Sequence, residues 1–108
     1  YTKELKNTSF MTPKTAKNNV HAFYVYVLRH PQRDKVMKIL AQNDIFVNIT
    51  YPYPIHTMSG MKNIIKKYNL PHSDKAADEI FSLPMYPMLK REEQNKVIKI
   101  LKQIDKNF

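Results

Sequence analysis

A short proline-containing segment carries the side chains of this chain that are best suited to contact a ligand. The segment is Tyr51-Pro-Tyr-Pro-Ile-His56. A phenol and an imidazole both donate and accept hydrogen bonds, so Tyr51 and His56 are able to bind hydroxyl or phosphate oxygens. In the structural alternative, Tyr51 packs over the adjacent prolines and His56 caps a loop carbonyl. The residue types alone favour this structural alternative.

Several kinds of chemistry are excluded by composition. The chain has no cysteine, which removes disulfides, thiolate metal sites and cysteine nucleophiles. Its single glycine, Gly60, excludes a P-loop or a dinucleotide fingerprint, because both need several glycines around the phosphates. His21, His30 and His72 are isolated from one another and from carboxylates at metal-ligand spacing. We therefore predict no catalytic residue and no metal site.

The net charge of +9 raises the question of an anionic partner. Three of the eighteen basic residues are arginines, few for a domain that grips phosphates bidentately. The fifteen lysines occur singly or in pairs along helical stretches, which is typical of solvated faces. We expect no nucleic-acid partner, and a basic α+β module that binds an anionic partner stays the alternative function. The longest apolar stretch, Ala22–Leu28, is too short to span a membrane, so we expect a soluble, cytoplasmic chain without a membrane partner.

The elements around the proline segment follow from periodicity and punctuation. Four extended pieces are predicted, at residues 10–11, 21–29, 45–50 and 82–87. Helices are predicted from Pro31 to Gln42, over 61–68, from an N-cap at Ser73 to Phe81, and over 91–105. The last helix is the clearest, because its apolar residues form one stripe: Val97, Ile98, Leu101 and Ile104. This order predicts an α+β domain, with a small, largely antiparallel sheet covered on one face by helices.

The first residues resemble the last turn of a helix that lacks a start signal. Tyr1–Leu5 has no N-cap before it, and residues 7–19 are polar without a sustained period. We expect residues 1–19 to be the end of an inter-domain helix with a connecting segment, and residues 20–108 to form the domain.

Three segments resemble consecutive motifs of one known family. Residues 76–87, AADEIFSLPMYP, resemble the pattern A-x-x-I-L-S-L-P-M-Y-P. Residues 48–56, NITYPYPIH, resemble G-I-H-Y-P-x-P-L-H, and residues 23–29 resemble the strand Y-H-L-Y-V-I-R. These patterns are typical of the C-terminal part of the sugar aminotransferases of the DegT/DnrJ/EryC1/StrS family, and they cover nearly the whole chain in the family's order. The family histidines of the last two patterns are replaced by Thr50 and Tyr24, and a glycine pair by Phe46 and Asn48.

This resemblance implies the C-terminal small domain of a fold-type I, pyridoxal-phosphate-dependent aminotransferase. The parent enzyme would transfer an amino group, typically from glutamate, to a nucleotide-linked keto-sugar for lipopolysaccharide or surface-polysaccharide biosynthesis. In the family the cofactor lysine, the aspartate at the pyridine nitrogen and most phosphate ligands belong to a larger N-terminal domain. We therefore expect this chain to bind no cofactor and to catalyse nothing by itself. It would complete the substrate site and the homodimer of the parent.

The resemblance also shifts the interpretation of the proline segment towards function. In the family the equivalent loop lies near the nucleotide-sugar and commonly reaches the active site of the partner subunit. Thr50, Tyr51 and His56 are therefore the candidate substrate-binding residues.

Overall fold

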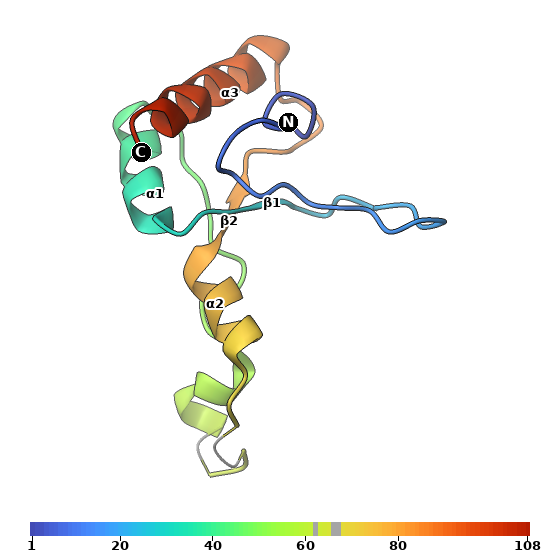
Figure 1. Ribbon diagram of the computed structural model, residues 1–108, viewed down its shortest axis with the longest axis vertical. Helices are drawn as coiled ribbons and strands as arrows, with labels where there is room; N and C mark the ends of the chain where they lie inside the picture. The colour runs from blue at the N-terminus through green and yellow to red at the C-terminus, as the bar shows by residue number, and fades with distance from the viewer. Residues whose placement is uncertain (62, 66–67) are drawn as a thin grey trace.

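The computed structural model describes residues 1–61, 63–65 and 68–108 of the chain. Its helices and strands are, in chain order, β1 (Tyr26–Arg29), α1 (Arg33–Gln42), α2 (Pro71–Glu79), β2 (Ile80–Leu83) and α3 (Arg91–Lys106) (Figure 1). Short 3-10 helices at Ile55–Thr57 and Ser59–Met61 lie between α1 and α2. None of the helices described in these ranges is both long and apolar enough to cross a membrane.

Strands β1 and β2 form the centre of a small antiparallel sheet, with Arg29 opposite Ile80. On the outer side of β1, Met11 and Arg29 exchange backbone hydrogen bonds of 3.0 and 3.1 Å. On the outer side of β2, Asn48 and Ser82 exchange backbone bonds of 2.7 and 3.4 Å. Four segments therefore lie side by side, and the predicted α+β class with a small antiparallel sheet is confirmed.

The strands are shorter than predicted. The predicted strand 21–29 pairs only from Tyr26 onwards, because the residues before it leave the core and Tyr24 is exposed. The predicted strand 45–50 is reduced to the bridge at Asn48. The prolines that follow it have no N–H to donate, so the pairing cannot extend in that direction.

Two helix boundaries also differ from the prediction. Helix α2 begins with Pro71 at its first turn, where a missing N–H is harmless, so Ser73 lies inside the helix and is not its N-cap. The same helix ends at Glu79 because the next residues pair in β2. Helix α1 ends at Gln42 as predicted but begins at Arg33. The predicted helix 61–68 includes residues 62, 66 and 67, which lie outside the described residues.

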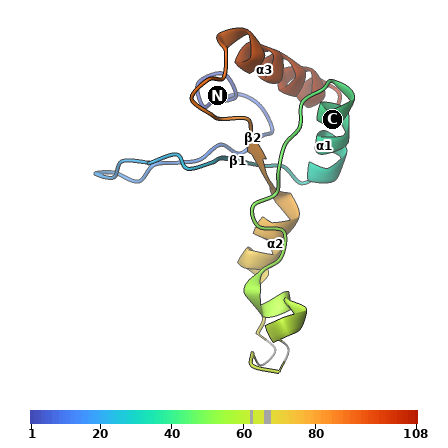
Figure 2. The same cartoon turned by 180° about the vertical axis from the view of Figure 1, so that it is seen from behind.

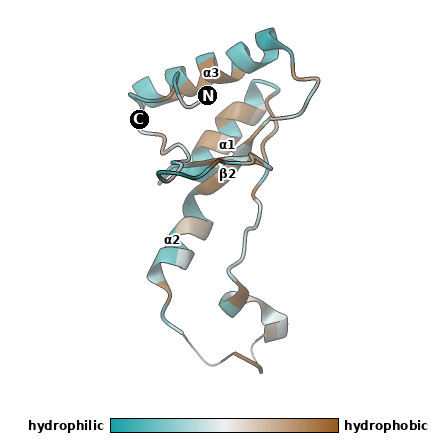
Figure 3. Cartoon of the chain, turned by 90° about the vertical axis from the view of Figure 1, so that its right-hand side faces the viewer, coloured by the Kyte–Doolittle hydropathy of each residue, from teal (hydrophilic) through white to brown (hydrophobic). Residues whose placement is uncertain are grey.

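The core lies between the sheet and the pair of helices α1 and α3. The predicted stripe of α3 is buried as expected, and three of its residues, Val97, Leu101 and Ile104, pack with buried residues of α1 and of both strands. Figure 3 shows hydrophobic residues in the middle of α3 and in α1 and β2 beneath it. The remaining core members are Leu5, Phe10, Tyr26, Leu28, Val36, Leu40, Ile45, Phe81 and Leu83. The sheet face that carries Leu28 and Phe81 is therefore the covered one.

Two arms leave this core in different directions (Figures 1 and 2). The first is the N-terminal arm, residues 12–24. It extends away from the core, turns back, and returns alongside itself to the start of β1. The second contains α2 and the described residues from Tyr51 to Met61, and it continues the line of β2 away from the sheet. These arms account for the elongated outline of 48 × 37 × 27 Å.

Two arginines hold α2 to the rest of the domain. Arg33 of α1 donates from Nη1 to the carbonyl oxygens of Ala77 and Ile80, where the last turn of α2 has no helical donors of its own. Arg29 of β1 donates from Nε and Nη2 to Oε2 of the buried Glu79, over 3.2 and 2.8 Å. The orientation of the second arm therefore depends on charged contacts at its root.

A hydrogen-bond chain that starts at the buried His30 fastens the N-terminal segment and α3 to the end of β1. Nδ1 of His30 accepts the backbone N–H of Gln32 over 3.1 Å, so Nε2 carries the proton of the neutral ring. Nε2 lies 3.3 Å from Oγ of Ser9, which donates to Oδ1 of Asp105 over 2.5 Å. Burial lowers the pKa of His30 below its ordinary value, although the carboxylates of Asp105 and Glu79 act in the opposite direction. In the neutral ring of His30, both nitrogens have a hydrogen-bond partner. A second ring proton, on Nδ1, would face the backbone N–H of Gln32.

The contact of Arg33 with α2 predicts a stability loss on Arg33→Met. Methionine keeps the apolar stem but removes the donor at the end of α2. We expect the free energy of unfolding to fall by about 1.5–3 kcal/mol, the range for hydrogen bonds that involve a charged group. Urea denaturation measures this change. Lys38→Met removes an exposed charge from the same helix and should change stability by at most about 0.5 kcal/mol; equal losses in both variants would contradict the capping role.

The buried His30 predicts a stability that depends on pH. Between its lowered pKa in the folded chain and its ordinary pKa of 6.5, the imidazole of His30 is mostly protonated in the unfolded chain and mostly neutral in the folded chain. Acidification therefore favours the unfolded state, and stability falls as the pH decreases from about 7 to 5. Asp105 and Glu4 have lowered pKa values, so these carboxylates become protonated in the folded chain only at pH values below this window. His30→Asn keeps an acceptor for Gln32 without titrating, so it should flatten the slope measured by urea denaturation.

The matched control for that slope is His72→Asn, because His72 is an exposed histidine of α2. This variant should keep the pH dependence of the wild type. A slope unchanged by His30→Asn would show that another group titrates in the window.

Candidate functional site

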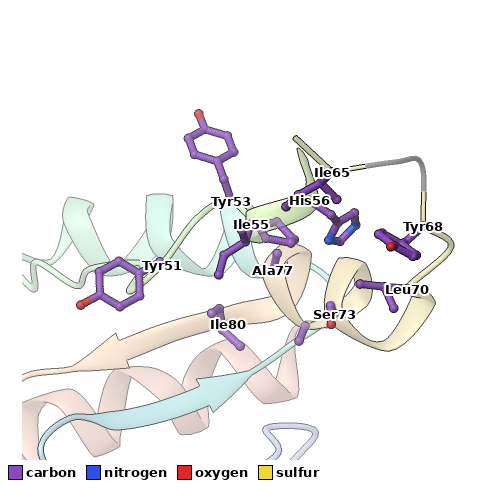
Figure 4. A pocket seen from close by; sticks show the side chains of 12 residues that line it. Tyr51, Tyr53, Ile55, His56, Ile65, Tyr68, Leu70, Ser73, Ala77 and Ile80 are labelled. Carbon is purple, nitrogen blue, oxygen red and sulfur yellow. The ribbon is translucent and has the colours of Figure 1, made fainter. Parts of the chain in front are cut away.

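The proline segment lines a shallow hollow between itself and α2 (Figure 4). The volume of this hollow is about 570 Å³. Its walls come from the proline segment, from Ile65, Tyr68 and Leu70, and from the side of α2 with the first residue of β2. The side chains described in the lining are Tyr51, Tyr53, Pro54, Ile55, His56, Ile65, Tyr68, Leu70, Ser73, Ala76, Ala77 and Ile80. We call it the tyrosine hollow.

His56 fastens the proline segment to α2. Its Nε2 lies 2.9 Å from Oδ1 of Asp74, and only 11% of its side chain is exposed. Asp74 lies in the first turn of α2, as predicted, where a negative charge is favourable. The expected structural alternative, a histidine that caps a loop carbonyl, is replaced by a contact with a carboxylate. The position of His56 suits a residue that orients the loop.

Tyr51 lies at the opposite end of the hollow from His56 and Tyr68 (Figure 4). Its side chain is 72% exposed, and that of Tyr53 is 67% exposed. In Figure 4 the ring of Tyr53 points away from α2. The Tyr51 phenol is thus open to a ligand and is not covered by its neighbouring prolines. Thr50 precedes it across a cis peptide bond and is half-buried.

The structure brings two of the three predicted residues to one hollow. Tyr51 and His56 both line it, whereas Thr50 is absent from its described lining. Tyr68 and Ser73 were missed by the sequence, and they add a phenol and a hydroxyl to the same walls. Their hydrogen-bonding capacity was visible in the sequence, but nothing in its local pattern links them to Tyr51, since α2 must fold back on the loop to bring them close.

The described polar groups of the tyrosine hollow are hydrogen-bonding groups around an apolar floor. Its described lining contains phenols, a hydroxyl and an imidazole, without a lysine or an arginine. Such groups bind hydroxyls and carbonyls of a ligand. They offer no amine to form an imine and no fixed cation to neutralise a phosphate. Among the residues of ranges 1–61, 63–65 and 68–108, no three histidines or carboxylates gather where a metal ion fits.

The lysines of residues 1–61, 63–65 and 68–108 do not gather on one aromatic-lined binding face. Those in the described ranges are distributed over the N-terminal turn, the N-terminal arm and all three helices. Exposed tyrosines concentrate instead in and around the proline segment. A face for single-stranded nucleic acid interleaves cations with exposed aromatic rings, so this distribution gives the alternative of a nucleic-acid module no support.

Comparison with known proteins gives one consistent family. The model of the DegT/DnrJ/EryC1/StrS aminotransferase family matches residues 1–102. The dTDP-3-amino-3,4,6-trideoxy-alpha-D-glucose transaminase of Micromonospora megalomicea is 45% identical over 94 residues, which cover 85% of this chain and 25% of that protein. The UDP-2-acetamido-2-deoxy-3-oxo-D-glucuronate aminotransferase of Pseudomonas aeruginosa is 32% identical, over 82% of this chain and 24% of that protein.

Solved structures share the fold. A DegT DnrJ EryC1 StrS aminotransferase from Brucella abortus superposes with a TM-score of 0.85 at 27% identity, over 96% of this chain and 28% of that chain. DesV of S. venezuelae, solved in complex with a ketimine intermediate, reaches a TM-score of 0.91 at 23% identity, over 96% of this chain and 29% of that chain. The chain thus spans about a quarter of the length of the relatives it matches.

Proposed function

This chain belongs to the DegT/DnrJ/EryC1/StrS aminotransferase family, and on that premise we propose that it is the C-terminal small domain of a pyridoxal-phosphate-dependent nucleotide-sugar aminotransferase. The parent transfers an amino group from glutamate to a nucleotide-linked keto-sugar, in the cytoplasm, for lipopolysaccharide or surface-polysaccharide synthesis. Residues 1–19 connect the large domain to residues 20–108, the small domain. The nucleotide-sugar transaminases among its relatives support this assignment.

One observation supports the substrate-binding role most directly. The proline segment is held on α2 through His56 and Asp74, yet it leaves the Tyr51 phenol open above an apolar hollow. A loop that is fixed at one end and exposed at the other presents a hydrogen-bonding group in a defined position. Binding sites gain affinity from such preorganisation, because less conformational freedom is lost when the ligand binds.

The described residues do not fit the cofactor itself. Pyridoxal phosphate needs a lysine amine and a basic or backbone-lined cup for its phosphate, and among the described residues that line the tyrosine hollow neither is present. When bound, the cofactor supplies the electron sink of the amino-transfer reaction. We therefore assign its binding to the large domain of the parent, and assign to this chain the binding and orientation of the sugar substrate.

Within that division, each residue of the loop has its own task. Tyr51 and Thr50 hydrogen-bond the nucleotide-sugar through their hydroxyls. His56 is a positioning residue, since its contact with Asp74 sets where the loop lies on α2. Tyr68 and the apolar floor exclude water from one side of the bound sugar.

Exposed apolar side chains support docking to the rest of a dimeric parent. Around the hollow, Ile55, Met58, Ile64 and Leu70 are exposed. Contiguous apolar surface of this kind is uncommon on free monomers and resembles a severed interface. We propose that the large domain and a second subunit cover it.

The proposal predicts that the isolated chain neither forms an imine with pyridoxal phosphate nor transaminates. The lysine and phosphate cup required for both are assigned to the large domain. A mixture of the chain and pyridoxal phosphate should show no visible absorbance band of an imine. Borohydride reduction should then attach the cofactor to no single specific lysine. A single modified lysine, found by mass spectrometry at stoichiometric yield, would refute this division of labour.

In the full-length parent, Tyr51→Phe should weaken use of the nucleotide-sugar. The ring that packs near the prolines is kept, while one neutral hydrogen bond is lost, so kcat/KM should fall by a factor equivalent to about 0.5–1.5 kcal/mol. Steady-state kinetics with the keto-sugar measure this change, and the melting temperature should stay the same. Tyr86→Phe, at an exposed tyrosine outside the hollow, is the matched control. Unchanged kinetics in Tyr51→Phe would assign the loop to scaffolding.

The positioning role of His56 is checked by a double-mutant cycle with Asp74. His56→Gln and Asp74→Asn should each raise KM for the sugar, and the double variant should raise it no further, because both remove one contact. The spectrum of the bound cofactor should stay unchanged. Additive effects of the two substitutions would show that the residues act separately.

A further inference from the structure

The hydrophobic core does not fix the direction of the second arm. None of the described residues in the range 51–79 belongs to the hydrophobic cluster that α1, α3 and the sheet form. Within α2, only Ala77 and Glu79 are buried, and both lie in its last turn. The angle at which this arm leaves the sheet (Figure 1) is therefore set by polar contacts at its root, since apolar packing is missing there.

Arg33 makes the contact that connects α2 with another helix. It is the first residue of α1, and only 13% of its side chain is exposed. Its Nη1 donates to the carbonyl oxygens of Ala77 and Ile80. Its Nε donates to Oδ1 of Asp34 over 2.8 Å. Because the donors of a guanidinium are fixed relative to one another, the contact with Asp34 also sets the direction in which Nη1 meets the end of α2.

The same side chain lies behind the proline segment. Arg33 lines a hollow of about 430 Å³ together with Pro52, Tyr53 and Pro54. Tyr53 and Pro54 also line the tyrosine hollow, so the proline segment separates the two hollows. Arg33 is absent from the described lining of the tyrosine hollow. It can therefore act on a sugar bound there only through the position of the loop and of α2.

The length of α2 amplifies a small rotation at its root. Asp74, which fastens His56 and the loop, lies five residues before Glu79 and thus about 7.5 Å away along the helix axis. A rotation of α2 by about 10° at its root would move Asp74, and the loop with it, by about 1.3 Å. A misplacement of about 1 Å is enough to slow a reaction about a hundredfold.

We propose that Arg33 is a positioning residue of the substrate site. By fixing the angle between α2 and the core, it places the Tyr51 phenol where the sugar binds. This assignment rests on the proposed function, in which the loop binds the sugar. The parent first takes the amino group from the amino donor and then gives it to the keto-sugar, and only the second half-reaction uses the loop. Arg33 therefore acts on the sugar half-reaction alone.

The first test measures the two half-reactions of the full-length parent separately, by stopped-flow absorbance of its cofactor. Arg33→Met should slow the reaction with the keto-sugar about tenfold or more, while the reaction with the amino donor stays within about twofold of the wild type. A general loss of folded enzyme would lower both half-reactions equally. Equal losses would therefore assign Arg33 to stability alone and overturn the proposal.

Two further variants make this test independent of a folding defect. Arg33→Lys keeps one cationic donor for the carbonyls at the end of α2, so it should show the same selective loss at a smaller size. Lys38→Met removes an exposed charge from the same helix and should leave both half-reactions within about twofold of the wild type. A selective loss of the sugar half-reaction in Lys38→Met would also overturn the proposal.

The second test observes the arm in the isolated chain. Because the chain has no cysteine, His72→Cys on α2 and Lys99→Cys on α3 provide the two attachment sites for nitroxide labels, both at exposed positions. Pulsed electron paramagnetic resonance should give one narrow distance distribution between them. Arg33→Met should widen or shift this distribution, and Lys38→Met should not. An unchanged distribution in Arg33→Met would contradict a role in fixing α2.

The label distances also separate this proposal from the proposed function. They are measured without a sugar, whereas the Tyr51→Phe kinetics depend on the sugar contact. A loop that binds no sugar would leave the kinetics of Tyr51→Phe unchanged but keep the effect of Arg33→Met on the distances. A fixed α2 in Arg33→Met, together with slowed kinetics in Tyr51→Phe, would overturn the positioning role and leave the proposed function intact.

Discussion

The buried carboxylate of Glu79 is the point on which the arrangement of the domain depends. It lies where α2 ends and β2 begins, and only 7% of its side chain is exposed. A carboxylate in such a position is stable only when it is paired and hydrogen-bonded. Arg29 supplies that pairing from the neighbouring strand, and the backbone carbonyl of Glu79 accepts the N–H of His30. One residue thus joins the helix that holds the loop to the strand that follows the N-terminal arm.

Neighbouring contacts extend this junction in both directions. Arg33 ties the last turn of α2 to α1, and His30 links the end of β1 to Ser9 and Asp105. At the other end of the sheet, the hydroxyl of Tyr1 donates to the carbonyl of Pro84 over 2.9 Å, and burial raises the pKa of this phenol to about 12. The N-terminal turn is therefore a packed part of the domain.

The sequence predicted best where one local pattern decides the outcome. Helix α3 was predicted within one residue, because its apolar stripe repeats over four turns and its lysines lie opposite. The extended pieces were found in the correct order, but their lengths depend on partners distant in the chain. The boundary at Glu79 was missed for the same reason: residues 80 and 81 have an ordinary helical pattern, and only the pairing with β1 makes them a strand. The contacts of His56 with Asp74 and of His30 with Ser9 also join residues 18 and 21 positions apart, which no local period reveals.

The separation of the arms from the core has a consequence for how such a domain diversifies. Tyr51, Tyr53 and Tyr68 of the tyrosine hollow are exposed, whereas stability resides in the packing of α1, α3 and the covered sheet face. Substitutions at exposed positions usually cost little stability. The residues of the second arm can therefore be exchanged while the same core remains folded. The surface of a domain of this shape is free to drift in sequence at nearly constant melting temperature.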